Sequence, residues 1–394
     1  MQYRKFGRLG YEVSALGFGC MRLPCEADGT IREEEARAMV RWAIDHGVNY
    51  IDTGYPYHGG RSEPFVGRTL RDGYRERVHL ATKMRIHRIQ ARDDFDRLLE
   101  EQLERLQTDY LDVYLLHGLR RWRWPKVRDL GVREWADRQL ADGRIGAIGF
   151  SFHDSFDMFK EIIDAYDNWS VCQVQYNYLN ERYQAGTRGL RYAAYKGLAV
   201  VIMEPLLGGR LAQPPADIAA MWAGAEVRRS PVEWALQWLW DQPEISVVLS
   251  GMSTMEQVQE NVASAGRSGI ATLTGAEIGL VEAVRDAYRR RMAVSCTGCG
   301  YCMPCPEGVD IPRTFTALNN GVLFGNLEAA RRSYTSLMED EPQTVLANHC
   351  VQCGICEPRC PQSLPIGEWM PYSHKVLAEG RAYRPEEAPA GAPN

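Results

Sequence analysis

The 394-residue sequence lacks the features that mark several specialised classes of protein. No run approaches ~20 consecutive apolar residues, so no segment is predicted to span a bilayer. Neither charge sign dominates, because 46 Lys and Arg stand against 51 Asp and Glu, for a formal net charge of -5. This balance gives no electrostatic reason to expect nucleic acid or an anionic membrane as a partner.

The N-terminus also lacks the short apolar stretch of a secretory signal. Disulfide frameworks are typical of small secreted domains, whereas 394 residues can bury a large core and suggest two domains. We therefore expect a reducing compartment, with the cytoplasm as the predicted location. Three of the 11 cysteines have no partner cysteine at ligand spacing and are expected to be small buried hydrophobes: Cys20, Cys25 and Cys172.

The other eight cysteines form two runs near the C-terminus. Three thiolates separated by two residues each bind three corners of a cubane iron–sulfur cluster, and a fourth cysteine before proline typically binds the other cluster. Structural zinc also uses Cys-x-x-Cys pairs, but two runs that both close with Cys-Pro are unusual for zinc. We therefore predict two [4Fe–4S] clusters and one-electron transfer. The runs are Cys296, Cys299, Cys302 and Cys305, and then Cys350, Cys353, Cys356 and Cys360.

The usual pairing of such runs is crossed. One cluster is then expected on Cys296, Cys299, Cys302 and Cys360, and the other on Cys350, Cys353, Cys356 and Cys305. This assignment comes from the motif, because a sequence alone does not pair ligands. The first run has two residues before its last cysteine where the common bacterial run has three, which weakens the expected role of Cys305 but not the prediction of clusters.

Short apolar runs alternate with amphipathic stretches over roughly the first two thirds of the chain. Continuous apolar runs of this length are typical of strands buried on both faces of a parallel sheet. Eight near-regular strand–helix units predict a (β/α)8 TIM barrel, with an open doubly wound sheet as the alternative. The runs are Ala15–Leu23, Tyr50–Thr53, Val78–Met84, Leu111–Gly118, Ile145–Phe152, Val171–Asn177, Ala199–Leu206 and Ile245–Met252.

The alternation ends at about residue 295. The stretch Thr314–Met338 has a helical pattern interrupted by Gly321 and Gly325, so both cysteine runs flank helical sequence. The tail from Pro385 is rich in Pro, Ala and Glu and is expected to be disordered. The predicted domains are therefore a barrel over 1–290, a helical, ferredoxin-like dicluster domain over 291–384 and a disordered tail over 385–394.

Four polar residues stand at or just after the ends of predicted strands, where barrel enzymes carry their chemistry. They are Asp52, Tyr57, Lys83 and His117. Each alone can be a loop cap, a half-buried aromatic, a rim charge or a core histidine, since structural networks also hold such groups. Together they suit acid catalysis, because an ammonium near a tyrosine stabilises the phenolate and lowers its pKa. The tyrosine can then protonate a carbonyl oxygen as hydride arrives.

The stretch from Asp52 to Glu63, Asp-Thr-Gly-Tyr-Pro-Tyr-His-Gly-Gly-Arg-Ser-Glu, resembles the aldo/keto reductase family. The resemblance covers about residues 1–266. It implies Tyr57 as general acid, Lys83 as the residue that tunes it, Asp52 as partner of Lys83, and His117 as the group that orients the carbonyl. The run from Cys296 to Pro306 is similar to the iron–sulfur branch of that family.

The cofactor-binding residues implied by the resemblance are Ser151, Gln173, Gly208, Glu260 and Asn261. The family's Asn after the serine is replaced by Phe152, and its nicotinamide-stacking aromatic falls at Met203. No Lys or Arg lies between Leu249 and Asn261, where a 2′-phosphate needs charge-assisted donors. NAD(H) is therefore the predicted dinucleotide and NADP the less favoured one, with FMN as an alternative. Gly208 and Gly209 suit a pyrophosphate clamp or a plain turn.

The predicted function is an oxidoreductase that interconverts a small-molecule carbonyl and an alcohol while two clusters relay electrons. Hydride carries two electrons and a cubane passes one, so a flavin is the usual converter between them. One alternative is therefore a flavin- or ferredoxin-linked oxidoreductase that does not use NAD(P)H, with a ferredoxin-like electron partner. Another is a conventional reductase whose clusters are structural or redox-sensing.

The loop after His117 predicts the class of substrate. It reads Gly-Leu-Arg-Arg-Trp-Arg-Trp over residues 118–124 and would lie over the site. Three arginines and two tryptophans suit an anionic or ring-bearing substrate. A solvated basic loop whose tryptophans pack on the tail domain is the alternative.

Overall fold

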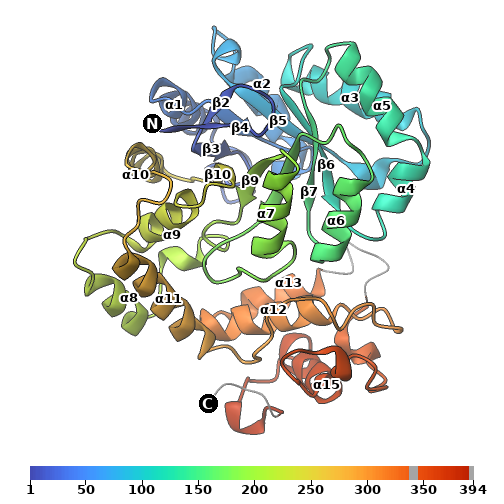
Figure 1. Cartoon of the computed structure of the whole chain (residues 1–394), viewed down its shortest axis with the longest axis vertical. Coiled ribbons are helices and arrows are strands. Elements are labelled where there is room, and N and C mark those ends of the chain that lie inside the picture. Colours follow the sequence, from blue (N-terminus) through green and yellow to red (C-terminus); the bar gives the residue numbers. More distant parts are fainter. Residues whose placement is uncertain (337–344, 390–394) are drawn as a thin grey trace. The chain divides into compact units, whose positions relative to one another are not determined.

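The fold is built on a closed barrel of eight parallel strands in the order β10-β3-β4-β5-β6-β7-β8-β9 (Figure 1). The computed structural model describes residues 1–336 and 345–389. The predicted TIM barrel is confirmed, and the open-sheet alternative is wrong. The strands are β3 Leu16–Gly19, β4 Tyr50–Asp52, β5 His79–Met84, β6 Val113–Leu119, β7 Ile148–Phe152, β8 Val171–Gln175, β9 Ala199–Met203 and β10 Ile245–Ser250.

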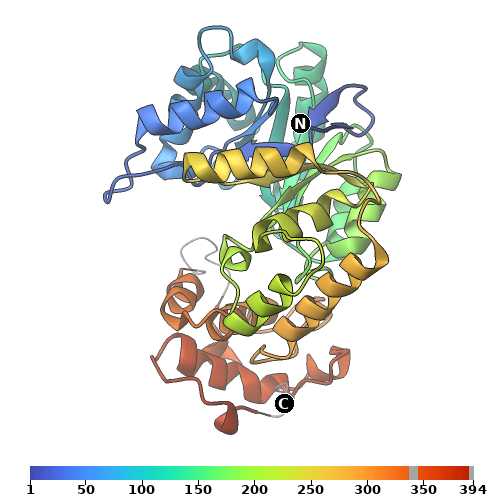
Figure 2. The ribbon, with the colours of Figure 1, turned by 90° about the vertical axis from the view of Figure 1, so that its left-hand side faces the viewer.

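Helices follow the strands and cover the outside of the barrel. On α3 (Asp94–Leu106) an apolar stripe, which runs from Phe95 to Leu106, is buried. Helices α1 and α10 pack against each other although more than 200 residues separate them (Figure 2). The barrel helices are α1 Glu33–Asp45, α2 Ser62–Thr69, α3 Asp94–Leu106, α4 Trp124–Asp129, α5 Val132–Ala141, α6 Phe156–Asp164, α7 Gly186–Tyr195, α9 Pro231–Trp240 and α10 Met255–Gly266.

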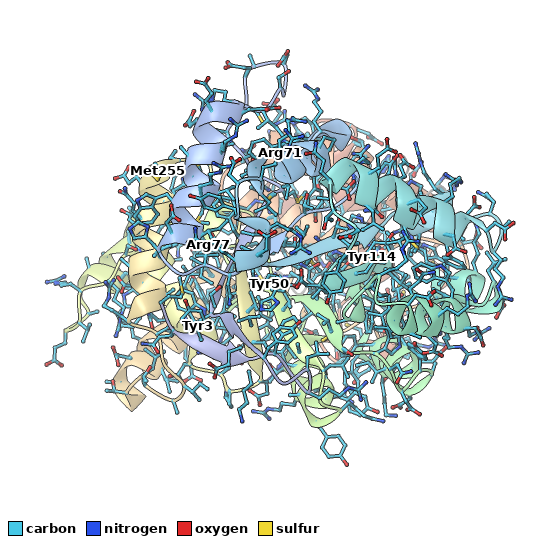
Figure 3. All side chains as sticks on the ribbon, turned by 90° about the horizontal axis from the view of Figure 1, so that it is seen from above. Tyr3, Tyr50, Arg71, Arg77, Tyr114 and Met255 are labelled. Carbon is cyan, nitrogen blue, oxygen red and sulfur yellow. The ribbon has the colours of Figure 1, made fainter. Side chains whose placement is uncertain are left out.

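Alternate residues of each strand face two different cores, because successive side chains of a strand point to opposite sides. Tyr50 on β4 belongs to the core inside the barrel, together with Ala81, Leu115 and Val171. Tyr114 on β6 belongs to the outer core between strands and helices, and its hydroxyl donates to Gln102 Oε1 of α3 at 2.6 Å (Figure 3). This two-residue register decides which later side chains reach the open end of the barrel.

A short N-terminal hairpin, β1 Tyr3–Lys5 and β2 Glu12–Ser14, was not predicted. Its connecting turn contributes Phe6 to the inner core, 5.5 Å from Tyr50 between ring centroids. A Cβ on Gly7 would lie 2.7 Å from the carbonyl oxygen of Gly197, so only glycine allows this approach. The hairpin therefore closes the end of the barrel at which the strands begin, and the strand C-termini form the other end.

The chain divides into two compact units. The first comprises Met1–Asn177, Ala185–Gly209 and Val232–Thr274, and the second comprises Tyr178–Gln184, Arg210–Pro231 and the chain from Gly275 onward. The domain boundary predicted near residue 290 stays a prediction. The helices of the second unit are α8 Ala216–Ala223, α11 Gly275–Arg289, α12 Ile311–Leu323, α13 Leu327–Thr335 and α15 Ile366–Leu377.

Within the second unit, α12, α13 and α15 pack on one another around a separate core. The helical pattern predicted from Thr314 breaks between α12 and α13, where Gly325 has φ 60° and the Asn326 side chain caps α13. Gly321, the other predicted interruption, lies inside α12. A Cβ there would lie 2.8 Å from Cβ of Ala330, so this glycine lets the two helices approach closely.

The end of the chain differs from the predicted disordered tail as far as it is described. Pro385–Glu387 form a 3₁₀ turn, and Arg384 Nη1 lies 3.0 Å from Glu387 Oε1. The predicted tail residues 390–394 and Met338, the end of the predicted helical stretch, lie outside the described residues. Across residues 1–336 and 345–389, no helix combines the length and apolar character that a bilayer crossing requires.

Candidate active site and cluster sites

The predicted catalytic side chains extend the inward-facing register of their strands by one step beyond the apolar core. Each polar residue stands two positions after the last inner apolar residue, so both point to the same side. The predicted residues at strand ends therefore converge at one mouth of the barrel. Asp52 follows Tyr50, Lys83 follows Ala81, His117 follows Leu115, and Gln173 follows Val171.

Lys83 and Asp52 form a buried ion pair at the base of this mouth. Lys83 Nζ donates to Asp52 Oδ1 at 2.6 Å and to the carbonyl oxygen of Thr53 at 2.7 Å. Lys83 Nζ also lies 4.8 Å from the centroid of the Tyr57 ring and hydrogen-bonds with the Tyr57 side chain. Burial disfavours the ammonium, but Asp52 and Tyr57 outweigh it and raise the pKa of Lys83. Lys83 is therefore a fixed positive charge beside Tyr57.

Tyr57 keeps part of its side chain accessible, but its acidity differs from the sequence expectation. Lys83 lowers the pKa of Tyr57, as expected, yet burial is the larger effect and leaves the pKa raised from its usual value of 10.0. The sequence placed the ammonium beside the phenol but carried no measure of burial. Without substrate or cofactor bound, the phenol of Tyr57 therefore keeps its proton at neutral pH.

His117 faces the Tyr57 ring edge to face, with 6.1 Å between ring centroids. Burial lowers the pKa of His117 well below its usual value, and the positive charges of Lys83, His153, Arg123 and His87 lower it further. The imidazole is therefore neutral at neutral pH and can both donate and accept a hydrogen bond.

A buried polar network supports the ion pair from below. Glu63 is fully buried; its Oε1 accepts from Thr82 Oγ1 at 2.7 Å and also from the Gln102 amide. Its other oxygen, Oε2, accepts from Arg105 Nε at 2.8 Å. The Gln102 amide also donates to the carbonyl oxygen of Lys83 at 3.2 Å. This network fixes the backbone of β5, the strand that carries Lys83. From the sequence, Glu63 was recognised only as the last residue of the segment that resembles the family, and the network was not predicted.

Tyr57 begins a 3₁₀ turn whose next residue, His58, has φ 53°. His58 Nε2 accepts from the Leu23 backbone N–H at 3.3 Å, and its Nδ1 lies 3.2 Å from Cys25 Sγ. Cys25 is only partly buried, unlike Cys20, so the expectation of three buried cysteines fails for Cys25. It helps to hold the Tyr57 loop, while Cys20 and Cys172 pack in the core as predicted.

Two glutamines of β8 present unpaired amide atoms on the inner face. Gln173 Nε2 donates to Asp52 Oδ2 at 3.2 Å, while its Oε1 is buried without a partner in the described structure. Gln175 Nε2, two residues further along the same face, is also a buried donor without a partner there. One free acceptor and one free donor match the two halves of a carboxamide. The sequence analysis named Gln173 and overlooked Gln175, which its two-residue spacing on β8 could have identified.

Phe152 and Met203, the two residues that differ from the family's cofactor site, lie at the ends of β7 and β9. Phe152 faces the outer core and packs on Phe159, with 5.0 Å between ring centroids. Ser151 faces inward, and its Oγ accepts from the Gly118 backbone N–H at 2.8 Å, which leaves the hydroxyl hydrogen free to point elsewhere. Met203 ends β9 and stays partly exposed. Of the two positions at which the family carries its Ser–Asn pair, only Ser151 therefore reaches the mouth.

The dinucleotide-side predictions divide between buried and exposed positions. Asn261 is buried and its Nδ2 donates to Ser250 Oγ at 3.1 Å, so it holds the end of β10, whereas Glu260 is exposed. Gly208 has φ 69°, as a tight turn needs. Gly208 follows β9 and Ser250 ends β10, and these strands are neighbours, so the turns after them form one turn region.

Arg22 enters this turn region from the loop after β3. A Cβ on Gly208 would lie 3.4 Å from Arg22 Nη2, and a Cβ on Gly251 would lie 3.2 Å from Cβ of Arg22. The carbonyl oxygen of Arg22 accepts from Ser253 Oγ at 2.8 Å. Arg22 was not predicted as a cofactor-site cation, because it lies more than 200 residues before the Leu249–Asn261 segment and only the fold brings the two together.

In the substrate loop, Arg121 and Arg123 are engaged in different ways. Arg121 is tied to Asp154, with Nη2 at 3.2 Å from Oδ1 and its backbone N–H donating to Oδ2 at 2.9 Å. Trp124 is fully buried in the outer core. Arg123 donates to the carbonyl oxygen of Gly118 at 3.1 Å and acts electrostatically on His117. Arg123 is thus the loop arginine that the structure couples to the mouth.

The eight cysteines of the two runs gather in the second unit in two groups. Burial, together with the neighbouring Cys299 and Cys360, raises the pKa of Cys296 to about 12. This brings Cys360, from the second run, beside the first run. The thiols that act on Cys350 are Cys305 and Cys353, so Cys305 from the first run lies beside the second run. Both neighbourhoods follow the crossed pattern of the predicted ligand sets.

One small cavity is lined by the second group, Cys305, Cys350, Cys353 and Cys356, and also by Cys302 of the first group. Gly298 and Gly300 in the first run, and Gln352 and Gly354 in the second, have positive φ. Such turns aim backbone N–H groups inward and recur at Fe–S sites. In the described ranges no three His, Cys, Asp or Glu side chains converge as ligands of one ion do.

Comparison with known proteins agrees with this geometry. Residues 15–284 match the model of the aldo/keto reductase family, and residues 295–364 match that of the 4Fe-4S dicluster domain. The chain belongs to the aldo/keto reductase family and carries a C-terminal dicluster domain, as the sequence resemblance predicted. It is an oxidoreductase, and the prediction of iron–sulfur clusters is confirmed at the level of the domain.

Relatives and solved structures cover the barrel. L-galactose dehydrogenase from Arabidopsis thaliana is 30% identical over 285 residues, which are 67% of this chain and 88% of that protein. The aldo-keto reductase AKR11C1 from Bacillus halodurans is similar with a TM-score of 0.61 and 26% identity, over 72% of this chain and 96% of that one. An aldo/keto reductase from Klebsiella pneumoniae in complex with NADP and acetate has a TM-score of 0.59 at 25% identity, over 72% and 95% of the two chains.

Proposed function

We propose that this protein interconverts a small-molecule carbonyl and an alcohol at the barrel mouth. The observation that carries the proposal is the pairing of two partly accessible groups, Tyr57 and His117, with the buried Lys83–Asp52 ion pair. Two accessible hydrogen-bonding side chains can hold a carbonyl oxygen, while the buried charge beside them stabilises negative charge that develops there.

In the direction of reduction, Tyr57 donates its phenolic proton to the carbonyl oxygen. Lys83 stabilises the phenolate that results, and Asp52 keeps Lys83 charged. Neutral His117 donates a hydrogen bond to the same oxygen and so orients the carbonyl. A bound nicotinamide supplies the hydride. In the reverse direction the phenolate accepts the alcohol proton, so one arrangement serves both directions.

The cofactor we propose is a nicotinamide dinucleotide, with NAD(H) preferred. The free acceptor on Gln173 and the free donor on Gln175 suit the carboxamide, and Ser151 offers a third polar contact. The guanidinium end of Arg22 lies beside Gly208, the turn expected to hold a pyrophosphate, so we assign Arg22 to the pyrophosphate. A solved relative holds NADP, and Arg22 is also near Gly251, so NADPH is the competing dinucleotide in the test.

The two clusters are proposed to relay single electrons between the protein and an external carrier. The second cysteine run is the more exposed: Cys353 is exposed, and Val351 and Ile355 beside it are 63% and 48% exposed. Large apolar side chains at the surface of a redox loop are typical of a transient contact surface. A ferredoxin-like protein is the proposed carrier. A reducing compartment such as the cytoplasm suits both the clusters and this carrier.

The substrate class that the charges favour is an acidic carbonyl compound. The guanidinium of Arg123 acts on His117 with positive charge, so the mouth favours an anion. An Arg123→Leu variant should lower kcat/KM about tenfold for a carboxylated carbonyl and little for its uncharged analogue. Arg121→Leu is the matched control, because Arg121 is engaged by Asp154. Equal losses for both substrates would remove Arg123 as the determinant of charge.

The first experiment is an anaerobic titration of reconstituted protein with NADH and, separately, NADPH. Visible cluster absorbance and low-temperature EPR are followed after the spectrum has been checked for bound flavin. Bleaching with a reduced-cluster signal supports the relay. If neither dinucleotide bleaches the clusters but carbonyl turnover proceeds, the relay fails and the clusters are structural or redox-sensing. If only reduced ferredoxin supports both cluster reduction and carbonyl turnover, the flavin- or ferredoxin-linked alternative replaces the dinucleotide.

A further inference from the structure

A cavity of ≈ 530 Å³ lies wholly within the second unit and is not used by the proposed reaction. Its volume is within the ~300–1,000 Å³ that small-molecule sites occupy. Its walls come from the loop 178–184, the end of α11, the start of the first cysteine run and α12. Cys296, a predicted cluster ligand, is among the lining residues. A ligand here would lie against the loop that holds the first cluster.

Positive charge dominates the lining of this cavity. Arg182, Arg289 and Arg290 contribute three guanidinium groups, against the one carboxylate of Asp286. Arg182 and Arg290 are exposed, whereas Arg289 is partly buried. Burial and the nearby charges of Arg285 and Arg182 lower the pKa of Arg289 despite its acidic neighbours, so the cationic groups crowd one another. An anion relieves that crowding, and guanidinium groups bind phosphate and carboxylate with paired hydrogen bonds.

An aromatic ring connects the cavity with the cluster loop. Tyr183 lines the cavity, and its ring packs so closely on Gly298 that any Cβ there would collide with it. Gly298 has φ 66° and stands between the first two cysteines of the run, and its backbone N–H donates to Cys296 Sγ at 3.4 Å. The apolar side chains Leu179, Met292 and Leu323 complete a wall suited to a flat ring.

Helix α12, which forms another wall of the cavity, is held in place by hydrogen bonds. Asn319 of α12 pairs with the backbone of Val294 through two hydrogen bonds of 2.8 Å, one accepted by Oδ1 and one donated by Nδ2. This pairing fixes the approach to Cys296 against α12. Asn320 and Thr316, also on α12, add further polar groups to the lining. The cavity therefore combines fixed polar groups, an apolar wall and a cationic rim.

We propose that this cavity binds an anionic, ring-bearing electron carrier of the flavin mononucleotide type, with its phosphate on Arg182, Arg289 and Arg290 and its ring towards Cys296. The inference rests on the proposed relay, which needs a converter between two-electron and one-electron steps. Oxidation of one reduced flavin releases two electrons and two protons. The two electrons reduce the two iron–sulfur clusters by one each, and the protons pass to water, so the step balances.

The test measures binding before any turnover. Reconstituted holoprotein is titrated anaerobically with FMN, with quenching of flavin fluorescence as the readout, and with riboflavin, which lacks the phosphate, as the matched ligand. We expect FMN to bind at least about tenfold more tightly than riboflavin. Arg182→Gln and Arg290→Gln should each weaken FMN binding about tenfold and leave riboflavin unchanged. Arg291→Gln is the control variant, because Arg291 pairs with Asp217 and does not line the cavity.

Two results would overturn the inference. One is no quenching by FMN up to millimolar concentration; the other is equal binding of FMN and riboflavin that the arginine variants do not change. Either result leaves carbonyl turnover with a dinucleotide unaffected, so this failure differs from failure of the proposed reaction. Conversely, if FMN binds as expected but its chemically reduced form, FMNH2, does not reduce the clusters, the converter role is refuted while the site is retained.

Discussion

Lys83 Nζ lies 2.6 Å from Asp52 Oδ1, and the two side chains are only 2% and 4% exposed. A charge removed from water at this depth is stable only while its partner and its other hydrogen bonds remain. The carbonyl oxygen of Thr53 accepts a second hydrogen bond from Lys83, and Gln173 donates to the other oxygen of Asp52. The pair is therefore both a catalytic element and a stability element of the barrel mouth.

Replacing one member of this pair should cost stability as well as activity. Asp52→Asn leaves the buried ammonium without its counter-charge, and we expect the free energy of unfolding to fall by about 3–5 kcal/mol. Denaturant unfolding measures this loss. Asp45→Asn is the control, since the Asp45–Arg77 pair is exposed and should change nothing measurable. A loss no larger than that of the control would contradict the buried-pair interpretation.

Removing one hydroxyl group tests the acid directly. Tyr57→Phe keeps the ring beside Lys83 but has no proton to donate, so carbonyl reduction should fall about 10²–10⁴-fold. Cluster absorbance should not change, because the cysteines lie in the other compact unit. Tyr55→Phe is the matched control: Tyr55 is buried, and its hydroxyl donates to Glu101. Turnover retained by Tyr57→Phe would remove Tyr57 as the acid.

The sequence predicted the barrel well because its signals are local. Each buried strand is a continuous apolar run, and the boundary errors are only a few residues, as between the predicted Ala15–Leu23 and the observed Leu16–Gly19. Asp52, Lys83 and His117 could be predicted for the same reason, since they directly continue such runs. The N-terminal hairpin was missed because its three-residue strands are too short to show a period.

Other parts of the site depend on long-range packing that no local pattern encodes. Arg22 reaches Gly208 and Gly251 only because β3 and β10 are neighbours in the closed barrel. The raised pKa of Tyr57 depends on burial by distant segments, so its direction could not be read from the adjacent lysine. The cavity beside Cys296 likewise joins segments more than 100 residues apart.

The depressed pKa of His117 makes a prediction about pH. In the unfolded chain the imidazole has its ordinary pKa of ~6.5, whereas burial and the nearby cations lower its pKa well below 6.5 in the folded state. The unfolded state therefore binds more protons below pH ~6.5, so the stability due to neutral His117 is lost as pH falls. From about pH 7.5 to about pH 5, the melting temperature of the wild type should therefore drop more than that of the His117→Gln variant. Parallel drops in the two proteins would refute the shift.

Arg22 offers a test of the dinucleotide site. With Arg22 on the pyrophosphate, Arg22→Gln should raise KM for NADH and NADPH alike, by about tenfold, with kcat little changed. An increase confined to NADPH would instead place the guanidinium on the 2′-phosphate and make NADPH the preferred cofactor. Arg32→Gln is a suitable control, because Arg32 lies on the same loop and forms an exposed pair with Glu35. No change with either dinucleotide would exclude Arg22 from the site.

The crossed ligand sets can be tested by removing one cysteine at a time. Cys360→Ala should abolish the cluster on Cys296, Cys299 and Cys302 although it changes the other run, because Cys360 neighbours Cys296. Cys305→Ala should abolish the cluster on the second run. Each variant should retain four of eight irons, and the two should lose different EPR signals. Cys172→Ala, in the barrel core, should retain all eight. If Cys360→Ala and Cys353→Ala lose the same signal, the runs bind their clusters separately and the crossed assignment is wrong.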